Sequence, residues 1–358
     1  MAADQLSIIH GVRGEVERTA LRARNGIKMA IGVSRPDVGR TPKDVVWSSG
    51  RAELWHYHND DVRYSPPLLV IPSLVSRSYI LDLTPGNSFI EQLVGAGLDV
   101  YMLDWGVADE RDAANRFEDY VDLAIPAAIR RVRRRSGADG VNLLGYCLGG
   151  VLTLLHAAHH PSSPLRSLTV VACPVDFRRL GPLGDIFGTT DLEVDAVLGD
   201  DGNIPPRVVL RGFRSLAPMG EITANVNLLD RLWSDEYVAA HQAMTGWATD
   251  HVPFPGATAR QMAQMLRDNA LVTGRMELGG DRVSLADIEV PFLSVLGTRD
   301  HIIPEPASAP VLELIGSADK HELRLDGGHV GLIVGRTAQR TTIPTLVEFL
   351  IRRSRALS

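Results

Sequence analysis

The chain has 358 residues, of which 45% are hydrophobic, and its mean hydropathy is close to zero. This length allows one large hydrophobic core plus an insertion, without plainly making two domains. The 37 basic and 43 acidic residues nearly balance, so charge gives no argument for binding to nucleic acid or to an anionic membrane. No apolar run approaches the roughly 18 residues that a membrane span requires. Without a visible secretion signal or a disulfide framework, the composition favours a cytoplasmic protein.

The first elements lead into an α/β core. Residues 15–32 predict a helix, and residues 44–64 predict alternating strands, so 1–65 form an N-terminal segment. From residue 66 to residue 176, apolar strand-like runs alternate with helical patterns, which is typical of a mostly parallel sheet with helices on both faces. The strands are predicted near Leu68, Val100, Val141 and Thr169, and the helices at 88–95, 117–135 and 151–159.

A sharp turn between a strand and a helix is predicted at residues 145–150, which read Gly-Tyr-Cys-Leu-Gly-Gly. This is a nucleophile elbow that carries Cys147 where hydrolases usually carry serine. The glycines permit strained backbone and a close approach of helix to strand. The positive end of the following helix favours the nucleophilic thiolate. The alternative is a buried cysteine in an ordinary glycine-containing loop.

Other reactive side chains are expected to be structural. Cys173 ends a continuous apolar run, which predicts an inert thiol in a buried strand. His156, His159 and His160 cluster at a helix end, but no cysteine or acidic residue lies at ligand spacing from them. A solvent-facing helix end is therefore favoured over a zinc site, and no metal or cofactor is predicted.

Between residues 177 and 288 the strand rhythm stops. The segment contains glycine and proline breaks and two helix-like runs, at 226–243 and 258–271. An insertion between the strand after the elbow and the next core strand is positioned to cover an active site, so the segment is interpreted as a lid. A second folded domain with its own site is the alternative. The core is expected to resume over 289–358.

Two candidate partners of Cys147 follow strand-like runs in this last segment. Asp300 comes after the apolar run 290–297, and His329 comes after the alternating segment 321–325. The chain order of nucleophile, acid and histidine is that of an α/β-hydrolase triad. In such a triad His329 takes the proton of Cys147, while Asp300 holds the imidazole in the required tautomer. Each residue alone could equally belong to an ordinary loop.

An acyl-transfer site also needs hydrogen-bond donors for the oxyanion. The elbow supplies the backbone N–H of Leu148. The second donor is expected in the loop after the strand at 68–71, where the N–H of Val75 is the candidate. Leu74 or Ser76 would fit the sequence nearly as well.

Several segments of the sequence together resemble a known family. The box at 145–150 matches the Gly-x-Cys-x-Gly-Gly box of the poly(3-hydroxyalkanoate) synthases, and the chain is similar along nearly its whole length to their class III catalytic subunit. The resemblance also covers residues 41–47, 103–106, 174–177, 202–205, 300–304 and 327–331. It implies an α/β-hydrolase fold with a lid insertion. The lid residues 181–202 depart from the usual family sequences in being poor in aromatic residues, which leaves the acyl chain length open.

The resemblance implies a polymerase of (R)-3-hydroxyacyl-coenzyme A that releases coenzyme A. Cys147 would accept the acyl group, His329 would act as its base, and Asp300 would help to activate the 3-hydroxyl of the incoming monomer. Asp300 could instead mainly orient His329. A thiolate suits this chemistry because it exchanges acyl groups with thioesters at little cost in free energy. A wet site would hydrolyse the acyl enzyme, so a cysteine-dependent thioesterase or polyester depolymerase is the alternative. A scaffolding protein that kept the fold is a third reading, which the complete set of three residues disfavours.

The resemblance further implies a second, non-catalytic synthase subunit and contact with the surface of a polyester granule. The lid also has more apolar residues than a small cover needs, which favours self-association through or near the lid. Burial against the core is the alternative. The residues concerned are Leu216, Met219, Trp233, Met244, Trp247, Met262 and Met265.

Overall fold

The computed structural model describes residues 15, 17–28, 37–181, 193–216 and 228–357. Within these residues a nine-stranded sheet forms the centre, with the spatial order β1-β2-β4-β3-β5-β6-β11-β12 and β13 paired to β3. Its strands are β1 (Lys43–Ser49), β2 (Ala52–Tyr57), β3 (Tyr64–Ile71), β4 (Leu98–Asp104), β5 (Val141–Tyr146), β6 (Leu165–Val171), β11 (Phe292–Gly297), β12 (Lys320–Leu325) and β13 (Arg355–Ala356).

The strands from β4 to β12 in this order run parallel. At one margin β1 and β2 pair antiparallel, and β13 pairs antiparallel with the start of β3. Every residue of β5 and β11 is buried, as the continuous apolar runs predict for strands covered on both faces. Because parallel strands end at one edge, the residues that follow β5, β11 and β12 meet there. This edge carries the candidate site.

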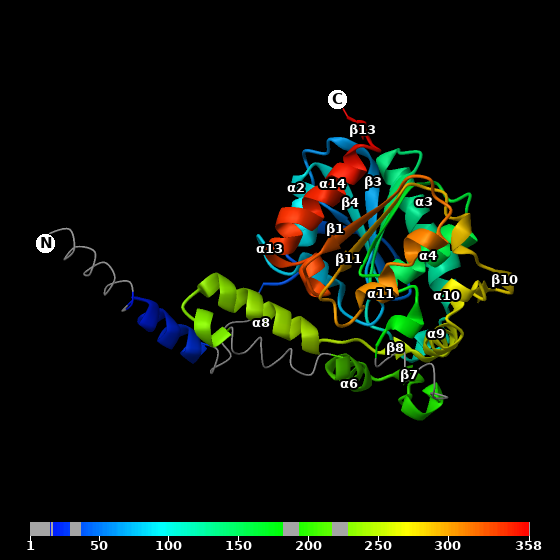
Figure 1. The fold of residues 1–358 in the computed structure, drawn as a ribbon. Coiled ribbons are helices and arrows are strands. Elements are labelled where there is room, and N and C mark those ends of the chain that lie inside the picture. The colour runs from blue at the N-terminus through cyan, green and yellow to red at the C-terminus, as the bar shows by residue number, and fades with distance from the viewer. Residues whose placement is uncertain (1–14, 16, 29–36, 182–192, 217–227, 358) are drawn as a thin grey trace, which may run out of the picture.

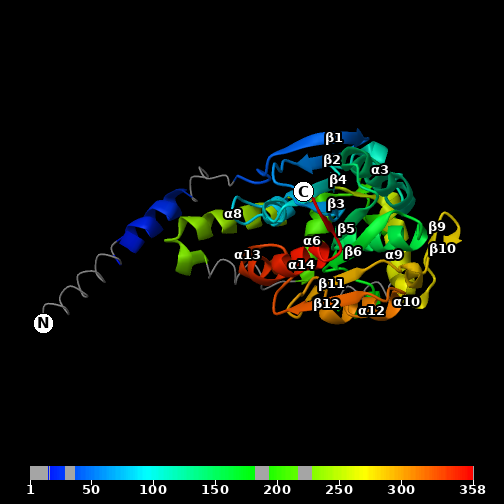
Figure 2. The same cartoon turned by 90° about the horizontal axis from the view of Figure 1, so that it is seen from above.

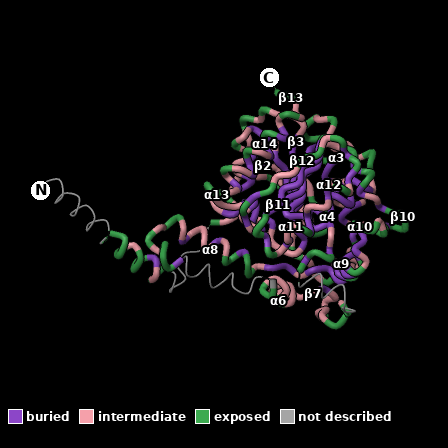
Figure 3. The backbone as a smooth tube through the Cα atoms, viewed as in Figure 1, coloured by how far each residue is buried: buried purple, intermediate pink, exposed green. Residues whose placement is uncertain are grey.

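Helices cover both faces of the sheet. Figure 1 shows α2 (Phe89–Gly95), α13 (Gly335–Thr337) and α14 (Ile343–Ile351) on one side, with α3 (Ile125–Ser136) and α4 (Leu148–His159) on the other. The buried residues gather in the sheet and on the helix faces turned toward it (Figure 3). The prediction of a mostly parallel sheet with helices on both faces is confirmed.

Two helix predictions in the segment 177–288 were wrong in detail. The run 226–243 is not one helix, because the chain turns at 232–233 and α8 (Asp235–Thr249) begins anew after Ser234, whose hydroxyl caps it. Residues 226 and 227 lie outside the described residues. The run 258–271 contains α9 (Gly256–Asp268) and then α10 (Ala270–Thr273), separated by Asn269 in the left-handed conformation with φ 50°. The side chain of Asn269 instead accepts from the N–H of Phe177 and donates to Asp176 Oδ1, distant partners that apolar periodicity does not register.

The helix predicted between 117 and 135 also differs from an ordinary α-helix. Residues Asp119–Ala124 form π-helical turns that lead into α3. The predicted N-terminal helix is described over residues 17–28, and 29–32 lie outside the described residues.

The segment 177–288 places most of its elements at the edge of the sheet where the parallel strands end (Figure 1). They include η4 (Phe177–Arg179), η5 (Val194–Val197), α6 (Pro206–Leu216), α9 and the short strands β7 (Asn203–Ile204) and β8 (Phe254–Pro255). A further hairpin is formed by β9 (Glu277–Leu278) and β10 (Asp281–Arg282). We call the segment 177–288 the lid.

Helix 17–28 meets the chain at the start of α8, and together they form an arm that projects from the body of the molecule (Figures 1 and 2). Asn25 Nδ2 donates to Leu232 O over 2.8 Å and to Asp235 Oδ1 over 2.9 Å. Arg24 forms an ion pair with the same carboxylate. Among the described helices, none combines the length and the apolar composition that crossing a bilayer requires.

Candidate active site

Cys147 lies at a strained turn between β5 and α4. Its backbone has φ 54° and ψ −122°, a conformation that side chains other than glycine rarely adopt. The turn is held by the backbone N–H of Cys147, which donates to Val171 O on β6 over 2.9 Å. Such strain at a single residue between strand and helix is the geometry of a nucleophile elbow.

Gly149 explains how α4 comes so close to the sheet. A Cβ atom at this position would lie 2.2 Å from Ile71 O and 2.6 Å from Pro72 O. The first turn of α4 therefore packs directly on the end of β3, where the loop 72–76 begins. A side chain here would push this loop away from Cys147.

Asp300 and His329 meet beside the elbow. His329 Nδ1 lies 2.8 Å from Asp300 Oδ2, and both side chains are at least 95% buried. The other carboxylate oxygen, Oδ1, accepts from the N–H groups of Ile302 and Ile303 over 2.9 and 2.8 Å. With three donors, the Asp300 carboxylate is fixed in position and directs His329 Nε2 away from itself.

The charge of His329 is set by its neighbours. Burial alone lowers the pKa of His329, but the negative charges of Asp300 and Cys147 and hydrogen bonds to both raise the pKa to about 10. His329 therefore carries a proton at neutral pH. The ring of Tyr146 lies 5.2 Å from the His329 ring and closes this side of the site.

The two predicted oxyanion donors lie at the same cavity as Cys147. Leu148 is the first residue of α4, so its N–H has no partner within the helix. The N–H of Val75 makes only a long hydrogen bond, 3.5 Å, to Ser73 Oγ, so an oxyanion could replace this acceptor. Of the three loop candidates, Val75 lines the cavity at Cys147, whereas Leu74 lines a different cavity.

The lid holds the loop 72–79 through polar contacts that the sequence did not suggest. His251 Nδ1 donates to Val75 O over 3.1 Å, and Trp247 Nε1 donates to Arg77 O over 2.9 Å. The Asp250 carboxylate accepts from Arg77 Nε over 3.4 Å and from the Tyr79 hydroxyl over 3.2 Å. The lid is therefore hydrogen-bonded to the loop 72–79, and no motif in the sequence predicts these contacts.

A cavity of about 410 Å³ opens on Cys147 beneath the lid. Its walls come from the elbow, from the loops after β3 and β11, and from η4, η5, α6 and α9 of the lid. They are almost entirely apolar. Cys147 itself is 8% exposed. An acyl group on its sulfur would therefore lie in an apolar environment.

Comparison with known proteins agrees with this geometry. Residues 66–192 match the family described as alpha/beta hydrolase fold, and residues 11–93 match the family described as Poly-beta-hydroxybutyrate polymerase (PhaC) N-terminus. The chain is 32% identical over 334 residues to the poly(3-hydroxyalkanoate) polymerase subunit PhaC of Allochromatium vinosum, covering 92% of this chain and 93% of that protein. The chain belongs to the poly(3-hydroxyalkanoate) polymerase family.

Other members of this family are similar to the chain to the same degree. The PhaC subunit of Thiocystis violacea is 30% identical, with 93% of its length covered. The PhaC subunit of Haloferax mediterranei is 32% identical, and the chain spans 66% of its length. The predicted family resemblance is confirmed.

Solved structures show the fold alone. Epoxide hydrolase A from Mycobacterium thermoresistibile superposes with a TM-score of 0.51 at 16% identity, covering 88% of this chain and 99% of that one. A hydrolase from Pseudomonas aeruginosa PA01 gives a TM-score of 0.50 at 15% identity, with the same coverage of both chains. The predicted α/β-hydrolase fold is confirmed.

Cys173, the second cysteine, lies behind the elbow of this family member. Burial, followed by the negative charge of Cys147, raises the pKa of its thiol well above the usual range. It therefore stays protonated. A Cβ atom added at Gly150 would lie 2.9 Å from the Cys173 sulfur. The Cys173 side chain therefore packs directly against the elbow and has a structural role.

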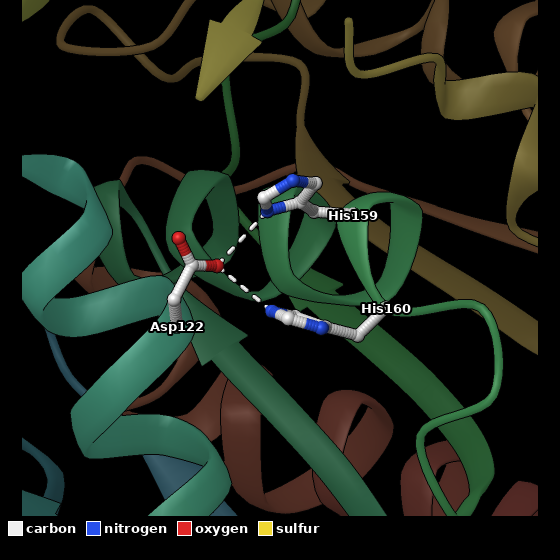
Figure 4. A group of neighbouring side chains, drawn as sticks. All are labelled: Asp122, His159 and His160. Atoms are coloured by element: carbon white, nitrogen blue, oxygen red, sulfur yellow. Dashed lines mark hydrogen bonds and ion pairs between the residues drawn. The ribbon is translucent and has the colours of Figure 1, made fainter. Parts of the chain in front are cut away.

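The histidine cluster differs from the sequence prediction. Asp122 Oδ1 lies 2.9 Å from His159 Nδ1 and 2.8 Å from His160 Nε2 (Figure 4), so the statement that these histidines lack an acidic partner was wrong. The π-helical turns before α3 pack against α4 and bring in Asp122 from 37 residues away. The three ligand atoms lie within 4.8 Å of one another, and two imidazoles with one carboxylate are a donor set that divalent transition metals accept.

His156 is not solvent-facing either. It is 1% exposed and contacts Val121 O over 2.9 Å and Ser163 Oγ over 3.0 Å. Burial lowers its pKa to about 4, against the opposing effect of the Val121 carbonyl, so His156 is neutral and connects α4 to its neighbours.

Proposed function

We propose that this chain polymerises (R)-3-hydroxyacyl-coenzyme A into polyester on Cys147 and releases coenzyme A. The observation that carries the proposal is the apolar cavity beneath the lid, which opens on the cysteine of a strained elbow in a chain of the poly(3-hydroxyalkanoate) polymerase family. Cys147, Asp300 and His329 are the proposed catalytic residues.

In the first step the Cys147 thiolate attacks the thioester carbonyl, and its oxygen becomes an oxyanion that accepts from the N–H groups of Leu148 and Val75. When the tetrahedral intermediate collapses, the bond to the coenzyme A sulfur breaks and the acyl group stays on Cys147. The leaving thiolate takes the proton of His329. The energy of the thioester is kept, because one thioester replaces another.

In the second step the 3-hydroxyl of the next hydroxyacyl group attacks the carbonyl of the acyl group held on Cys147, and His329 accepts the hydroxyl proton. An ester bond forms, the bond between the carbonyl carbon and the Cys147 sulfur breaks, and the Cys147 thiolate is freed. Asp300 contacts His329 through one carboxylate oxygen and two backbone N–H groups through the other, which favours an orienting role over direct activation of the hydroxyl.

Transfer rather than hydrolysis is favoured because the acyl group would lie among apolar side chains, which favour the 3-hydroxyl of an incoming hydroxyacyl group over water as the nucleophile. The competing function is a cysteine-dependent hydrolase of the same fold. Both would use the same three residues, so the products decide between them.

The test is to incubate the purified chain with 3-hydroxybutyryl-coenzyme A, long enough to pass a lag, and to weigh the products. We expect polymer together with one free coenzyme A for each monomer consumed. Free 3-hydroxybutyrate in equal amount to coenzyme A would show a hydrolase instead. No release of coenzyme A would contradict both functions.

We further propose that the chain works in the cytoplasm at the surface of the polyester granule, with a separate non-catalytic subunit and with a second copy of itself. Much of the lid's apolar content is buried against the core or at the cavity, as for Trp247, Met262 and Met265. In helix 17–28 and in the residues just before α8, Ile27, Leu229 and Trp233 are still exposed at 62%, 67% and 37%. The side chain of Leu216 and residue Met219 lie outside the described residues.

This partnership predicts a long lag in polymer formation by the isolated chain, because an exposed apolar arm is a surface for association. Addition of the partner subunit is expected to shorten the lag and raise the rate of coenzyme A release. Light scattering during the same reaction would follow self-association. A chain that stays monomeric and reaches its full rate at once, without a second protein, would contradict the dependence.

A further inference from the structure

Two histidines and an aspartate meet at the end of α4 that is far from Cys147. His159 is the last residue of α4, and His160 caps the helix. Consecutive residues of a helix point in different directions. His160 has left the helix, with φ −124° and ψ 65°, and both rings contact the Asp122 carboxylate. Figure 4 shows one oxygen of this carboxylate pointing between the two rings.

The distances within this cluster fit the ligands of a single metal ion. Asp122 Oδ1 lies 2.9 Å from His159 Nδ1 and 2.8 Å from His160 Nε2. With bonds of about 2.1 Å to a common ion, neighbouring ligand atoms lie roughly 3.0 to 3.4 Å apart, so both distances are close to those of a coordination sphere. All three atoms lie within 4.8 Å of one another. Two such bonds reach about 4.2 Å, so at most a small rotation of one ring completes the set.

The surroundings of the cluster favour a cation. The end of α4 is the negative end of the helix dipole, where the last carbonyl groups have no N–H partner within the helix. The second ring nitrogen of His159, Nε2, lies 3.8 Å from Asp281 Oδ2 of β10. Histidine ligands of metals usually donate their other N–H to a carboxylate or a carbonyl, which holds the first nitrogen toward the ion. Asp281 is placed for this role.

The cluster is accessible to an ion from solvent. The side chains of Asp122 and His160 are 23% and 36% exposed, so binding does not require the core to open. His160 also lines a cavity of about 220 Å³ beside the end of α4. A site with its ligands in place and an entry path meets the structural requirements for metal binding.

We propose that Asp122, His159 and His160 bind one divalent transition metal ion of the zinc type. Two imidazoles and one carboxylate suit such an ion, and water completes its coordination. The ion ties the end of α4 to the π-helical turns of Asp119–Ala124. The 12 residues of α4 separate the site from Cys147 by about 18 Å, so the site is structural and takes no part in acyl transfer.

Binding of Zn²⁺ to the untagged full chain tests the site. The Cys147→Ala variant is the parent in all measurements, because the active-site thiol beside His329 is itself a zinc ligand. After dialysis against EDTA, calorimetric titration should show one Zn²⁺ per chain. A Zn²⁺ concentration 100-fold above Kd should raise the thermal midpoint by about 4 °C.

Two substitutions remove one ligand each. Asp122→Asn keeps the size and one oxygen of the side chain, and His160→Gln keeps a polar side chain at the helix end. Each should weaken Zn²⁺ binding at least about 100-fold, because even the loss of a residue behind a ligand costs 10- to 100-fold. Circular dichroism checks that both variants fold as the parent does.

The matched control is His58→Gln. His58 Nε2 lies 3.0 Å from Asp44 Oδ2, and among the described residues no further histidine, cysteine or carboxylate completes a ligand set there. This variant should bind Zn²⁺ as tightly as the parent. A parent that binds no Zn²⁺ would overturn the proposal and leave the cluster as hydrogen bonds alone. Equal binding by the parent, Asp122→Asn and His160→Gln would also overturn it. None of these measurements depends on polymer formation, so they are independent of the proposed function.

Discussion

Cys147→Ala is expected to abolish coenzyme A release and polymer formation while leaving the fold intact. The covalent intermediate requires the sulfur, and the smaller methyl side chain fits the same strained turn. The loss should be at least on the order of 10⁴-fold, as for the removal of other catalytic nucleophiles. Circular dichroism and the rate of coenzyme A release measure the two parts of this expectation.

Cys147→Ser should also be nearly inactive, because a hydroxyl beside the same histidine is far less ionised than a thiol. The matched control is Cys173→Ala. Its buried, protonated thiol takes no part in the reaction, so most of the activity should remain. Comparable activity in Cys147→Ala and the wild type would rule out the acyl-cysteine mechanism.

The second large effect is expected at the buried pair of Asp300 and His329. His329→Ala should stop both acylation and elongation, because the same imidazole serves the thiol and the incoming hydroxyl. Asp300→Asn should slow both steps by at least about 100-fold. The loss should be smaller than the ~10⁴-fold seen when the acid of a serine triad is replaced, because a thiol ionises more easily than a hydroxyl.

Single-turnover mass spectrometry distinguishes the two roles of Asp300. If the aspartate mainly orients His329, as its contacts favour, acylation of Cys147 is already slow in Asp300→Asn. If acylation is fast and the acyl enzyme accumulates, Asp300 instead activates the monomer hydroxyl.

The same variant has a predicted pH dependence. The pKa of His329 is raised to about 10 in the fold, against about 6.5 in an unfolded chain. Protonated His329 therefore stabilises the fold fully below about pH 6.5, and this contribution is lost as pH rises toward 10. In Asp300→Asn the neighbouring charge is gone. The difference in unfolding free energy between wild type and variant, from urea titrations, should shrink between pH 6.5 and pH 9.5. A constant difference would contradict the charged pair.

Local features of the sequence were sufficient to predict the elbow and the strands around it. A strand, a glycine-rich turn and a helix are consecutive in the chain, so their geometry depends on neighbouring residues alone. The order of Cys147, Asp300 and His329 was informative for a related reason. Each follows a strand, and parallel strands bring their carboxyl ends to one edge of the sheet.

Features that join distant residues were decided only by the tertiary structure. Asp122 reaches His159 and His160 because two helices pack on the same face of the sheet. His251 reaches Val75 from 176 residues away through the fold of the lid. Neither contact leaves a spacing pattern in the chain, so neither could be predicted from the sequence.

The sequence by itself predicted the elbow at Cys147, the chain order of its candidate partners and the family, because these depend on local turns and on motifs. The tertiary structure showed that Val75 lines the cavity at Cys147, how the lid is hydrogen-bonded to the loop 72–79, and how large the apolar cavity is. These properties depend on packing between segments far apart in the chain, where side-chain volume and contact geometry are set by the whole fold.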